Sequence, residues 1–180
     1  MMQAQDIIAF WFDEIEPMKW WVKDAEFDAL LETKFLALHQ QAIHCELYEW
    51  RATAQGRLAE IIILDQFSRN IFRDTPQAFA ADALALALAQ EAIALGMDKA
   101  LSALERSFLY MPFMHSESLK IHDVAVKLFT ENGIESNLEF ELQHRDIIVQ
   151  FGRYPHRNQI LNRESSAEEL AFLQQPGSSF

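Results

Sequence analysis

The sequence has little cysteine and no stretch that could anchor it in a membrane. Its single cysteine, Cys45, excludes an internal disulfide framework and a zinc site made of paired cysteines. The first residues lack a basic stretch followed by an apolar one, so we expect no secretory signal peptide. No run approaches the length of about 18 uncharged apolar residues that a membrane span requires. Together, these absences predict a cytoplasmic protein.

Basic residues are also few. The 180 residues contain 15 Lys and Arg against 27 Asp and Glu, which gives a formal net charge of −12. A nucleic acid or an anionic membrane would be repelled over most of such a surface, so we expect neither as a partner. Half of the residues are hydrophobic and 12% are aromatic, which is enough to bury a core and excludes a disordered chain.

Glycine and proline are scarce too, with five of each, and nearly all lie where a helix should begin or end. Asp24 is a good N-cap, Thr75 before Pro76 predicts another helix start, and Gly96 suits a left-handed helix end. We expect the pair Met111-Pro112 to break or kink the chain. Three S-x-x-E pairs predict capping boxes: Ser102 with Glu105, Ser136 with Glu139, and Ser165 with Glu168.

Between these signals, apolar residues recur at helical spacing, and no segment is convincing as a strand. The predicted helices span 3–15, about 25–44, 55–69, 76–95, a helix from 102 to the break at 111–112, about 115–130, 136–152, and a short helix before 176. The fold class is therefore all-α, with about eight helices packed as antiparallel hairpins. Because no linker or change of composition divides the chain, we expect a single domain, 1–180.

Charged and polar residues on the predicted core faces are the strongest functional signal. Five of them are Asp65, Arg69, Asp82, Glu117 and His144. Such residues are rarely fully buried unless they are paired. In one interpretation, Asp65 and Arg69 form an ion pair, the others bond backbone groups, and all of them only fix the register of the helices. In the other, Asp65, Arg69, Glu117 and His144 meet around a polar cavity, with Asp82 nearby.

A local excess of positive charge is the second signal. Residues 143–163 contain four arginines and one acidic residue, and 152–158 joins two predicted helices. Arginine forks suit carboxylate or phosphate groups, which predicts an anion pocket. Alternatively, the arginines dock onto acidic residues of neighbouring helices. The pocket would draw on Arg69, Asn70, Arg73, Arg153, His156, Arg157 and Asn158.

Signatures of metal binding and nucleophilic catalysis are weak. His115 and His122 are seven residues apart, too far for the i,i+4 pair of a helical chelate, and a site from His115, Glu117 and His144 is the remaining arrangement. Cys45 beside His44 does not make a catalytic dyad by adjacency alone. Dinucleotide-binding, P-loop and nucleophile-elbow motifs are missing from the sequence. We therefore predict no metal and no cofactor.

Three long motifs carry a family resemblance. They are LDQFSRNIFR at 64–73, followed by Phe79 and Asp82; FLYMPFMHSE at 108–117; and HRDII at 144–148 with FGRYPHRN at 151–158. With them, the chain resembles the bacterial family known as domain of unknown function 924 over nearly its whole length. The resemblance implies a helical fold like that of tetratricopeptide repeats and no established activity. Members often have Arg where this chain has Gln150, which removes one cation from the predicted pocket.

Three hypotheses about function follow. The first is a cytosolic protein that binds a small anionic ligand or a peptide carboxylate, with the ligand-binding residues Arg69, Asn70, Arg73, His115, Arg153, His156, Arg157 and Asn158. The second is an enzyme of hydrolase or lyase type, in which His144 or Glu117 acts as general base beside Asp65. The third is a structural interaction module. A homodimer is left open, and the fold does not decide among the three.

Overall fold

The computed structural model describes residues 2–180, and these form helices and loops without a strand. The predicted all-α class is confirmed; residue 1 of the predicted domain lies outside the described residues. The α-helices are α1 (Ala4–Ala9), α2 (Ala25–Ile43), α3 (Ala54–Ile62), α4 (Ser68–Ile71), α5 (Gln77–Ala80), α6 (Asp82–Ala94), α7 (Ala103–Met114), α8 (Leu119–Asn132), α9 (Glu135–Phe151) and α10 (Ala167–Phe172). Two π-helical segments are Phe10–Glu14 and Ile63–Phe67, and the 3₁₀ segments are Pro17–Trp20, Tyr48–Ala52, Met97–Ala100 and Pro155–Arg157.

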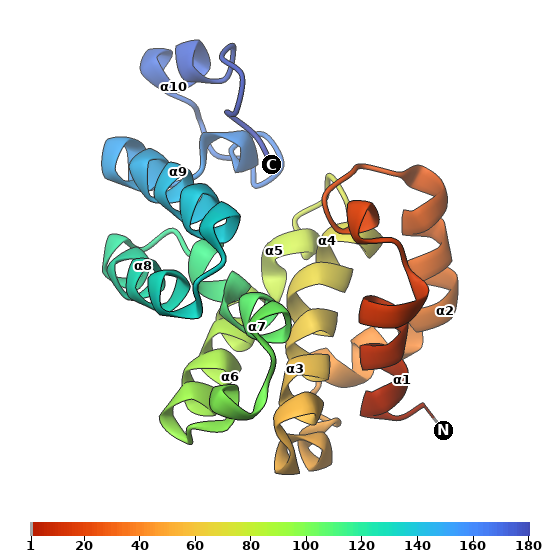
Figure 1. The fold of residues 1–180 in the computed structure, drawn as a ribbon. Coiled ribbons are helices and arrows are strands. Elements are labelled where there is room, and N and C mark those ends of the chain that lie inside the picture. Colours follow the sequence, from red (N-terminus) through yellow and green to blue (C-terminus); the bar gives the residue numbers. More distant parts are fainter. Residues whose placement is uncertain (1) are drawn as a thin grey trace.

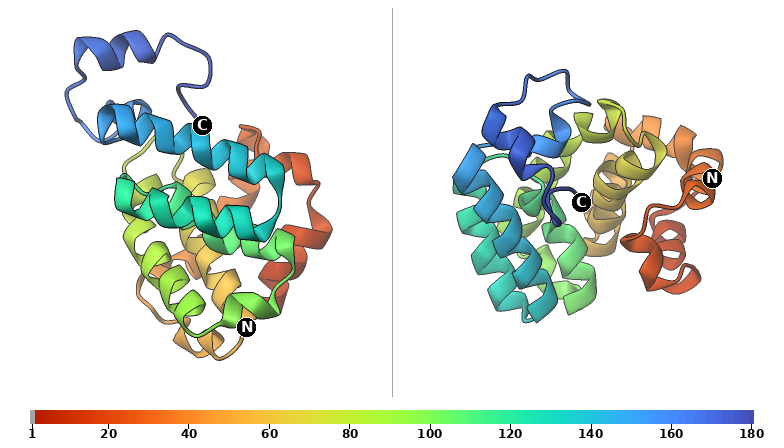
Figure 2. Two further views of the ribbon diagram at one scale, coloured as in Figure 1. Left: turned by 60° about the vertical axis from the view of Figure 1, so that its left-hand side comes forward. Right: turned by 90° about the horizontal axis from the view of Figure 1, so that it is seen from above.

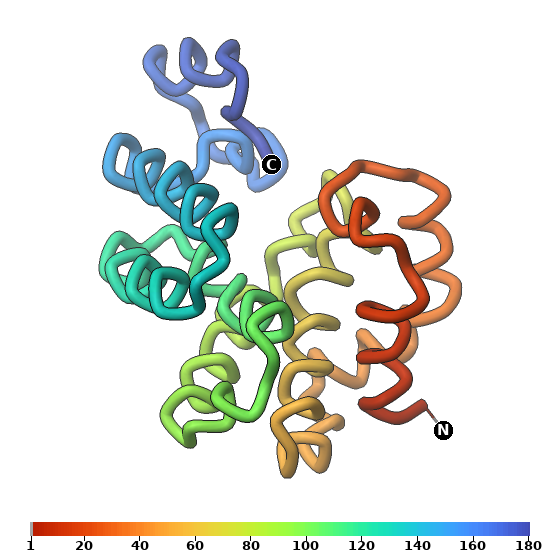
Figure 3. Tube along the Cα trace, viewed as in Figure 1, coloured from red at the N-terminus to blue at the C-terminus, as the bar shows by residue number. Residues whose placement is uncertain are grey.

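The helices follow one another in an arc, from α1 and α2 on one side to α9 and α10 on the other (Figure 1). Helix α1 packs on α3, α2 on α4, and α3 on α6 and α7, and the pairs α6–α7, α7–α8 and α8–α9 continue the series. Because short loops join α7 to α8 and α8 to α9, these neighbours run in opposite directions (Figure 2). The trace in Figure 3 shows that the last residues turn back from α10 toward α9.

Several helix ends form as the sequence predicts. The Asp24 side chain accepts hydrogen bonds from the amides of Glu26 and Phe27 at the start of α2. Ser102 and Glu105 make the predicted capping box at the start of α7. Gly96, Gly133 and Gly152 all have positive φ at helix ends, a conformation that costs glycine little. Caps and left-handed glycines therefore place the helices along most of the chain.

Two predicted capping boxes are wrong. Helix α9 begins at Glu135 after Ile134, so Ser136 lies inside the helix and does not cap it. At α10 the box forms one residue later than predicted, between Ser166 and Glu169, while the Ser165 hydroxyl accepts a hydrogen bond from Asn158. The sequence SSAEE contains both registers of the motif, so spacing alone could not separate them.

Three predicted helices have different limits. The segment 76–95 is interrupted at Ala81, and this makes Asp82 the first residue of α6. Helix α7 continues through Pro112 to Met114, because the burial of residues 107–114 outweighs the one backbone hydrogen bond that proline removes. His115 therefore ends α7, and α8 begins only at Leu119.

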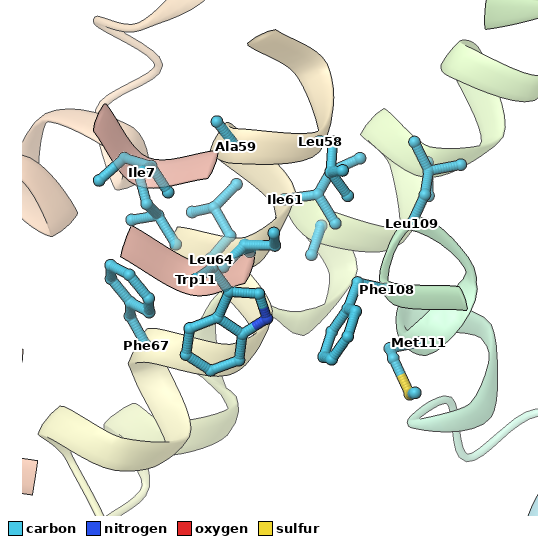
Figure 4. Close-up of a cluster of buried hydrophobic side chains, with 14 of the residues drawn as sticks. Ile7, Trp11, Leu58, Ala59, Ile61, Leu64, Phe67, Phe108, Leu109 and Met111 are labelled. Atoms are coloured by element: carbon cyan, nitrogen blue, oxygen red, sulfur yellow. The ribbon is translucent and has the colours of Figure 1, made fainter. Parts of the chain in front are cut away.

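The main hydrophobic core lies between α1, α2, α3, α7 and the two π-helical segments. Trp11 is its largest buried side chain, and its ring lies 5.6 Å from the ring of Phe67 and 5.7 Å from that of Phe108 (Figure 4). This core includes residues from α1 to α8. The segment from α9 onward has a separate and much smaller cluster, made of Ile147, Ile148 and Tyr154. Among residues 2–180, we find no helix with the length and apolar character needed to span a bilayer.

Candidate functional site

Asp65 lies at the centre of a buried polar cluster. It sits in the π-helical segment Ile63–Phe67, where α3 widens by one residue per turn before α4, a feature that often occurs at functional sites. Its side chain is 1% exposed, and one carboxylate oxygen lies 2.7 Å from Nδ1 of His115 while the other accepts a hydrogen bond from Gln66. The Asp65 carboxylate is therefore buried in the interior, close in sequence to the core residue Phe67.

Arg69 joins this carboxylate to a second one. Its Nη1 lies 3.3 Å from Oδ1 of Asp65, which is four residues earlier in the sequence, so the predicted i,i+4 ion pair is present. Its two terminal nitrogens donate to both oxygens of Asp82 at 2.8 and 3.0 Å. The interruption of the helix at Ala81 places Asp82 at the start of α6, where its carboxylate accepts both hydrogen bonds from Arg69. Two carboxylates therefore hold Arg69 in a fixed orientation.

Arg157 completes the cluster from the far end of the chain. Its guanidinium lies between the rings of Phe79 and Tyr154, at 4.5 and 4.7 Å from their centroids. It donates to the His115 carbonyl at 2.9 Å, and it reaches Asp82 only at 3.6 Å. The residue is 5% exposed, and its Nε has no hydrogen-bond partner within residues 2–180. Arg157 is thus the least compensated buried cation of the cluster.

The charges of the cluster shift one another's pKa values. Burial alone would raise the pKa of Asp65, but His115 and Arg69 outweigh burial and hold that pKa at about 2. Burial, followed by the positive charge of Arg69, lowers the pKa of His115. Burial and Arg69 also lower the pKa of Arg157 to about 10. At neutral pH the cluster therefore contains an ionised Asp65, two guanidinium groups and a neutral His115 imidazole.

The hydrogen bond to Asp65 fixes the orientation of His115. An ionised carboxylate can only accept, so Nδ1 of His115 carries the proton and donates it to Asp65 at 2.7 Å. Nε2 makes no hydrogen bond among the described residues and is not fully buried. An imidazole held in this way by a buried carboxylate has its basic nitrogen available to a bound molecule.

Glu117 lies beside the cluster and is bound to the segment after α9. Its oxygens accept two hydrogen bonds from Arg163, at 2.8 and 2.9 Å, and one from the backbone amide of Tyr154 at 2.8 Å. Burial would raise the pKa of Glu117, but Arg163 and the Tyr154 amide outweigh it and lower that pKa. A carboxylate with these partners anchors 154–163 to the loop before α8.

His144 is held in a different environment. Its Nδ1 donates to the Phe140 carbonyl at 2.7 Å, and its ring lies 3.8 Å from that of Phe180 and 5.8 Å from that of Tyr154. Burial, with a smaller effect from neighbouring histidines, lowers its pKa to about 3. Within the described residues, no hydrogen bond or ion pair joins His144 or Glu117 to Asp65; His115 is the histidine that pairs with Asp65.

The other residues predicted to bind an anion are mostly engaged with acidic groups. Asn70 and Arg73 both donate to Asp28 of α2. Arg153 donates to both oxygens of Glu169, and Asn158 bonds Ser165 and Arg163. His156 differs, because its Nδ1 is buried without a hydrogen-bond partner and its ring lines an open hollow of about 620 Å³ beside α10.

Tyr154 is the central residue that the sequence analysis does not single out. It is fully buried, donates its hydroxyl proton to the Met114 carbonyl at 2.5 Å, and lies 3.0 Å from Nε2 of His122. Its ring contacts Arg157 on one side and His144 on another. A tyrosine in the predicted pocket loop, followed by Pro155, was the available signal. Within residues 2–180, no group of three or more His, Cys, Asp or Glu is placed to hold a metal ion.

The structure thus defines an all-helical protein with a buried cluster of charged and aromatic side chains from the π-helical segment Ile63–Phe67, α4, α6, the C-terminal end of α7 and the segment after α9. The family described as bacterial protein of unknown function DUF924 matches residues 7–177, and the chain belongs to this family, as its motifs predict. A solved structure of a protein of unknown function from Agrobacterium tumefaciens is 42% identical; the match covers 95% of this chain and 96% of that one, with a TM-score of 0.90. Among curated proteins, none matches this chain. The likeness to tetratricopeptide repeats stays a prediction.

Proposed function

We propose that this protein binds a small anionic ligand at the cluster formed by Asp65, Arg69, Asp82, His115 and Arg157. The observation that carries the proposal is the incomplete pairing of Arg157. A buried cation normally has a close carboxylate and a partner for each N–H group. Arg157 instead lies 3.6 Å from the carboxylate of Asp82, which already accepts a hydrogen bond from Arg69. The Nε of Arg157 has no hydrogen-bond partner in the described part of the chain.

An anion would supply what Arg157 lacks. A carboxylate or phosphate oxygen at Nε would complete its hydrogen bonding and offset the repulsion between the two guanidinium groups. His115 lies beside this position, since its carbonyl accepts a hydrogen bond from Nη2 of Arg157. Arg73 and Arg153 stand outside the proposed site, because each is paired through two hydrogen bonds with a carboxylate that is not part of the cluster, Asp28 and Glu169 respectively.

Titration with inorganic phosphate and with acetate, at constant ionic strength, tests this proposal. We expect at least one of them to raise the melting temperature of the wild-type protein and to bind about ten-fold more weakly to Arg157→Lys, which keeps the charge but loses the fork. Arg145→Lys is the matched control, since Arg145 pairs on the surface with Asp123. Equal binding by the wild type and Arg157→Lys, or no binding of either anion, would overturn the proposal.

A second candidate function is acid–base catalysis, which the geometry of His115 favours. Asp65 orients Nδ1, and Nε2 is left to take a proton from a ligand. His115→Asn keeps a donor toward Asp65 but has no basic nitrogen. If the protein hydrolyses an activated ester such as p-nitrophenyl acetate, this variant should lose that activity and retain anion binding; retained hydrolysis would exclude His115 as the base.

A further inference from the structure

The ring of Phe180 occupies a pocket made of three other aromatic rings. Its centroid lies 3.8 Å from that of His144, 4.5 Å from that of His156 and 5.1 Å from that of Tyr154. Residues 173–180 turn back from α10 to bring it there, toward α9 and the 3₁₀ segment Pro155–Arg157 (Figures 1 and 2). The last segment of the chain therefore covers three rings, of which Tyr154 also contacts Arg157 of the candidate site.

Few interactions hold this segment in place. Beyond Gln175, whose amide donates to the Phe172 carbonyl, the described hydrogen bonds include only one from 176–180, from the Ser178 hydroxyl to the Leu173 carbonyl. Gly177 has a φ of +77°, which allows the chain to turn. Phe180 is 49% exposed although it contacts three rings. A segment with so few hydrogen bonds can leave its pocket at a small free-energy cost.

The pocket suits a flat and uncharged ring. Burial lowers the pKa of both His144 and His156 to about 3, so both imidazoles are neutral aromatic rings at neutral pH. The Tyr154 ring meets Phe180 nearly edge-on, at 86°. Such aromatic arrangements are favoured beyond the burial of apolar area.

Tyr154 also joins this pocket to the proposed anion site. Its ring contacts Phe180, and the Arg157 guanidinium lies 4.7 Å from the centroid of the same ring. His156, next in sequence to Pro155 and Arg157, contacts Phe180 and has a buried Nδ1 without a partner among the described residues. A ring in the pocket and an acidic group at Arg157 are therefore only one tyrosine side chain apart.

We propose that the ligand of the Arg157 site is a small aromatic acid, whose ring replaces Phe180 against His144, Tyr154 and His156 while its acidic group binds Arg157. The proposal rests on the proposed anion-binding function. In the absence of such a ligand, Phe180 fills the ring pocket and shields it from water. The chain's own side chain thus competes with the ligand for one half of the site.

Calorimetric titration of the full chain with phenylacetate and with acetate tests the inference, because the two probes differ only in the ring. We expect phenylacetate to bind at least ten-fold more tightly than acetate. Phe180→Ala should tighten phenylacetate binding several-fold further and leave acetate unchanged, since it removes the competing ring. Leu170→Ala is the control, because Leu170 is similarly exposed, at 55%, but lies on α10.

The outcomes separate the two proposals. Equal affinities for phenylacetate and acetate, or weaker phenylacetate binding by Phe180→Ala than by Leu170→Ala, would overturn the ring pocket. If acetate or phosphate binding still depends on Arg157 in that case, the anion site stands and only the aromatic ligand is wrong. If neither probe binds in a manner that depends on Arg157, both proposals fail. Circular dichroism of each variant confirms that the helices are intact.

Discussion

The two halves of this molecule are held together by different forces. From α1 to α8, a continuous apolar core surrounds Trp11, with side chains such as Leu31 and Phe67 that solvent does not reach. From α9 onward, the apolar cluster is small, and ion pairs and aromatic contacts between side chains far apart in sequence replace it. The first half should therefore respond mainly to changes in packing, and the second to changes in charge.

We expect the largest loss of stability from a substitution that leaves a cavity in the apolar half. Leu31→Ala removes a fully buried side chain and should lower the free energy of unfolding by about 2–5 kcal/mol. Leu30→Ala, in the same helix but at a position 48% exposed, is the matched control and should cost less than about 1 kcal/mol. Urea unfolding measures both. Similar losses for the two variants would contradict the packing of α2 described above.

Breaking an ion pair that joins the polar half to the loop before α8 should have a smaller and more local effect. Glu117→Gln removes the charge that holds Arg163 and the Tyr154 amide, and we expect a loss of about 2 kcal/mol. Hydrogen exchange should show faster exchange in 153–165 and unchanged protection in α2. Asp123→Asn disrupts the exposed pair with Arg145 and should cost at most about 0.5 kcal/mol. Uniform loss of protection across the chain would remove the distinction between the halves.

The smallest effect is a dependence of stability on pH that arises in the polar half. The pKa of His144 is lowered in the folded state to about 3, so the unfolded state binds more protons as the pH falls below about 6.5. Its contribution to stability is complete above that pH and is lost as the pH falls toward 3. Between pH 7.5 and 5.5 the loss is about 1.4 kcal/mol for one such histidine.

The substitution His144→Phe keeps a ring against Phe180 but cannot titrate. We therefore expect urea unfolding of this variant to lose about 1.4 kcal/mol less than the wild type between pH 7.5 and 5.5. His44→Phe is the control, because the His44 side chain is 71% exposed and should leave the pH dependence unchanged. If wild type and His144→Phe lose the same stability over this range, His144 is not the titrating group.

Much of the helical framework could be predicted from residues that begin or end a helix through contacts with their neighbours in sequence. Asp24, Ser102 and the left-handed glycines act on their own chain neighbours, so their effect is visible in the sequence. The polar residues on core faces were visible for a related reason, since Asp65 and Arg69 interrupt an apolar stripe. The predicted contact between them is present at 3.3 Å.

The partners of these residues could not be predicted, because they come from distant parts of the chain. Asp65 pairs with His115, 50 residues later, and Glu117 with Arg163, 46 residues later. An excess of arginine in 143–163 indicated where positive charge gathers, but not that Arg163 and Arg153 would be neutralised by carboxylates while Arg157 would not. Which residues become partners depends on the packing angles between helices, and these angles cannot be predicted from the spacing of residues along the sequence.

The π-helical turn at 63–67 has a consequence for how this protein can change. A turn of this kind accommodates one residue more than an α-helical turn, so the helix on either side keeps its own register while the two registers are offset. Removing a single residue there would restore an α-helical turn and leave α4 close to its present orientation, whereas removing one from the regular part of α3 would rotate all the residues after it by about 100°. Asp65 lies inside this wider turn, so the direction of its carboxylate depends on the number of residues in the turn as well as on their identity.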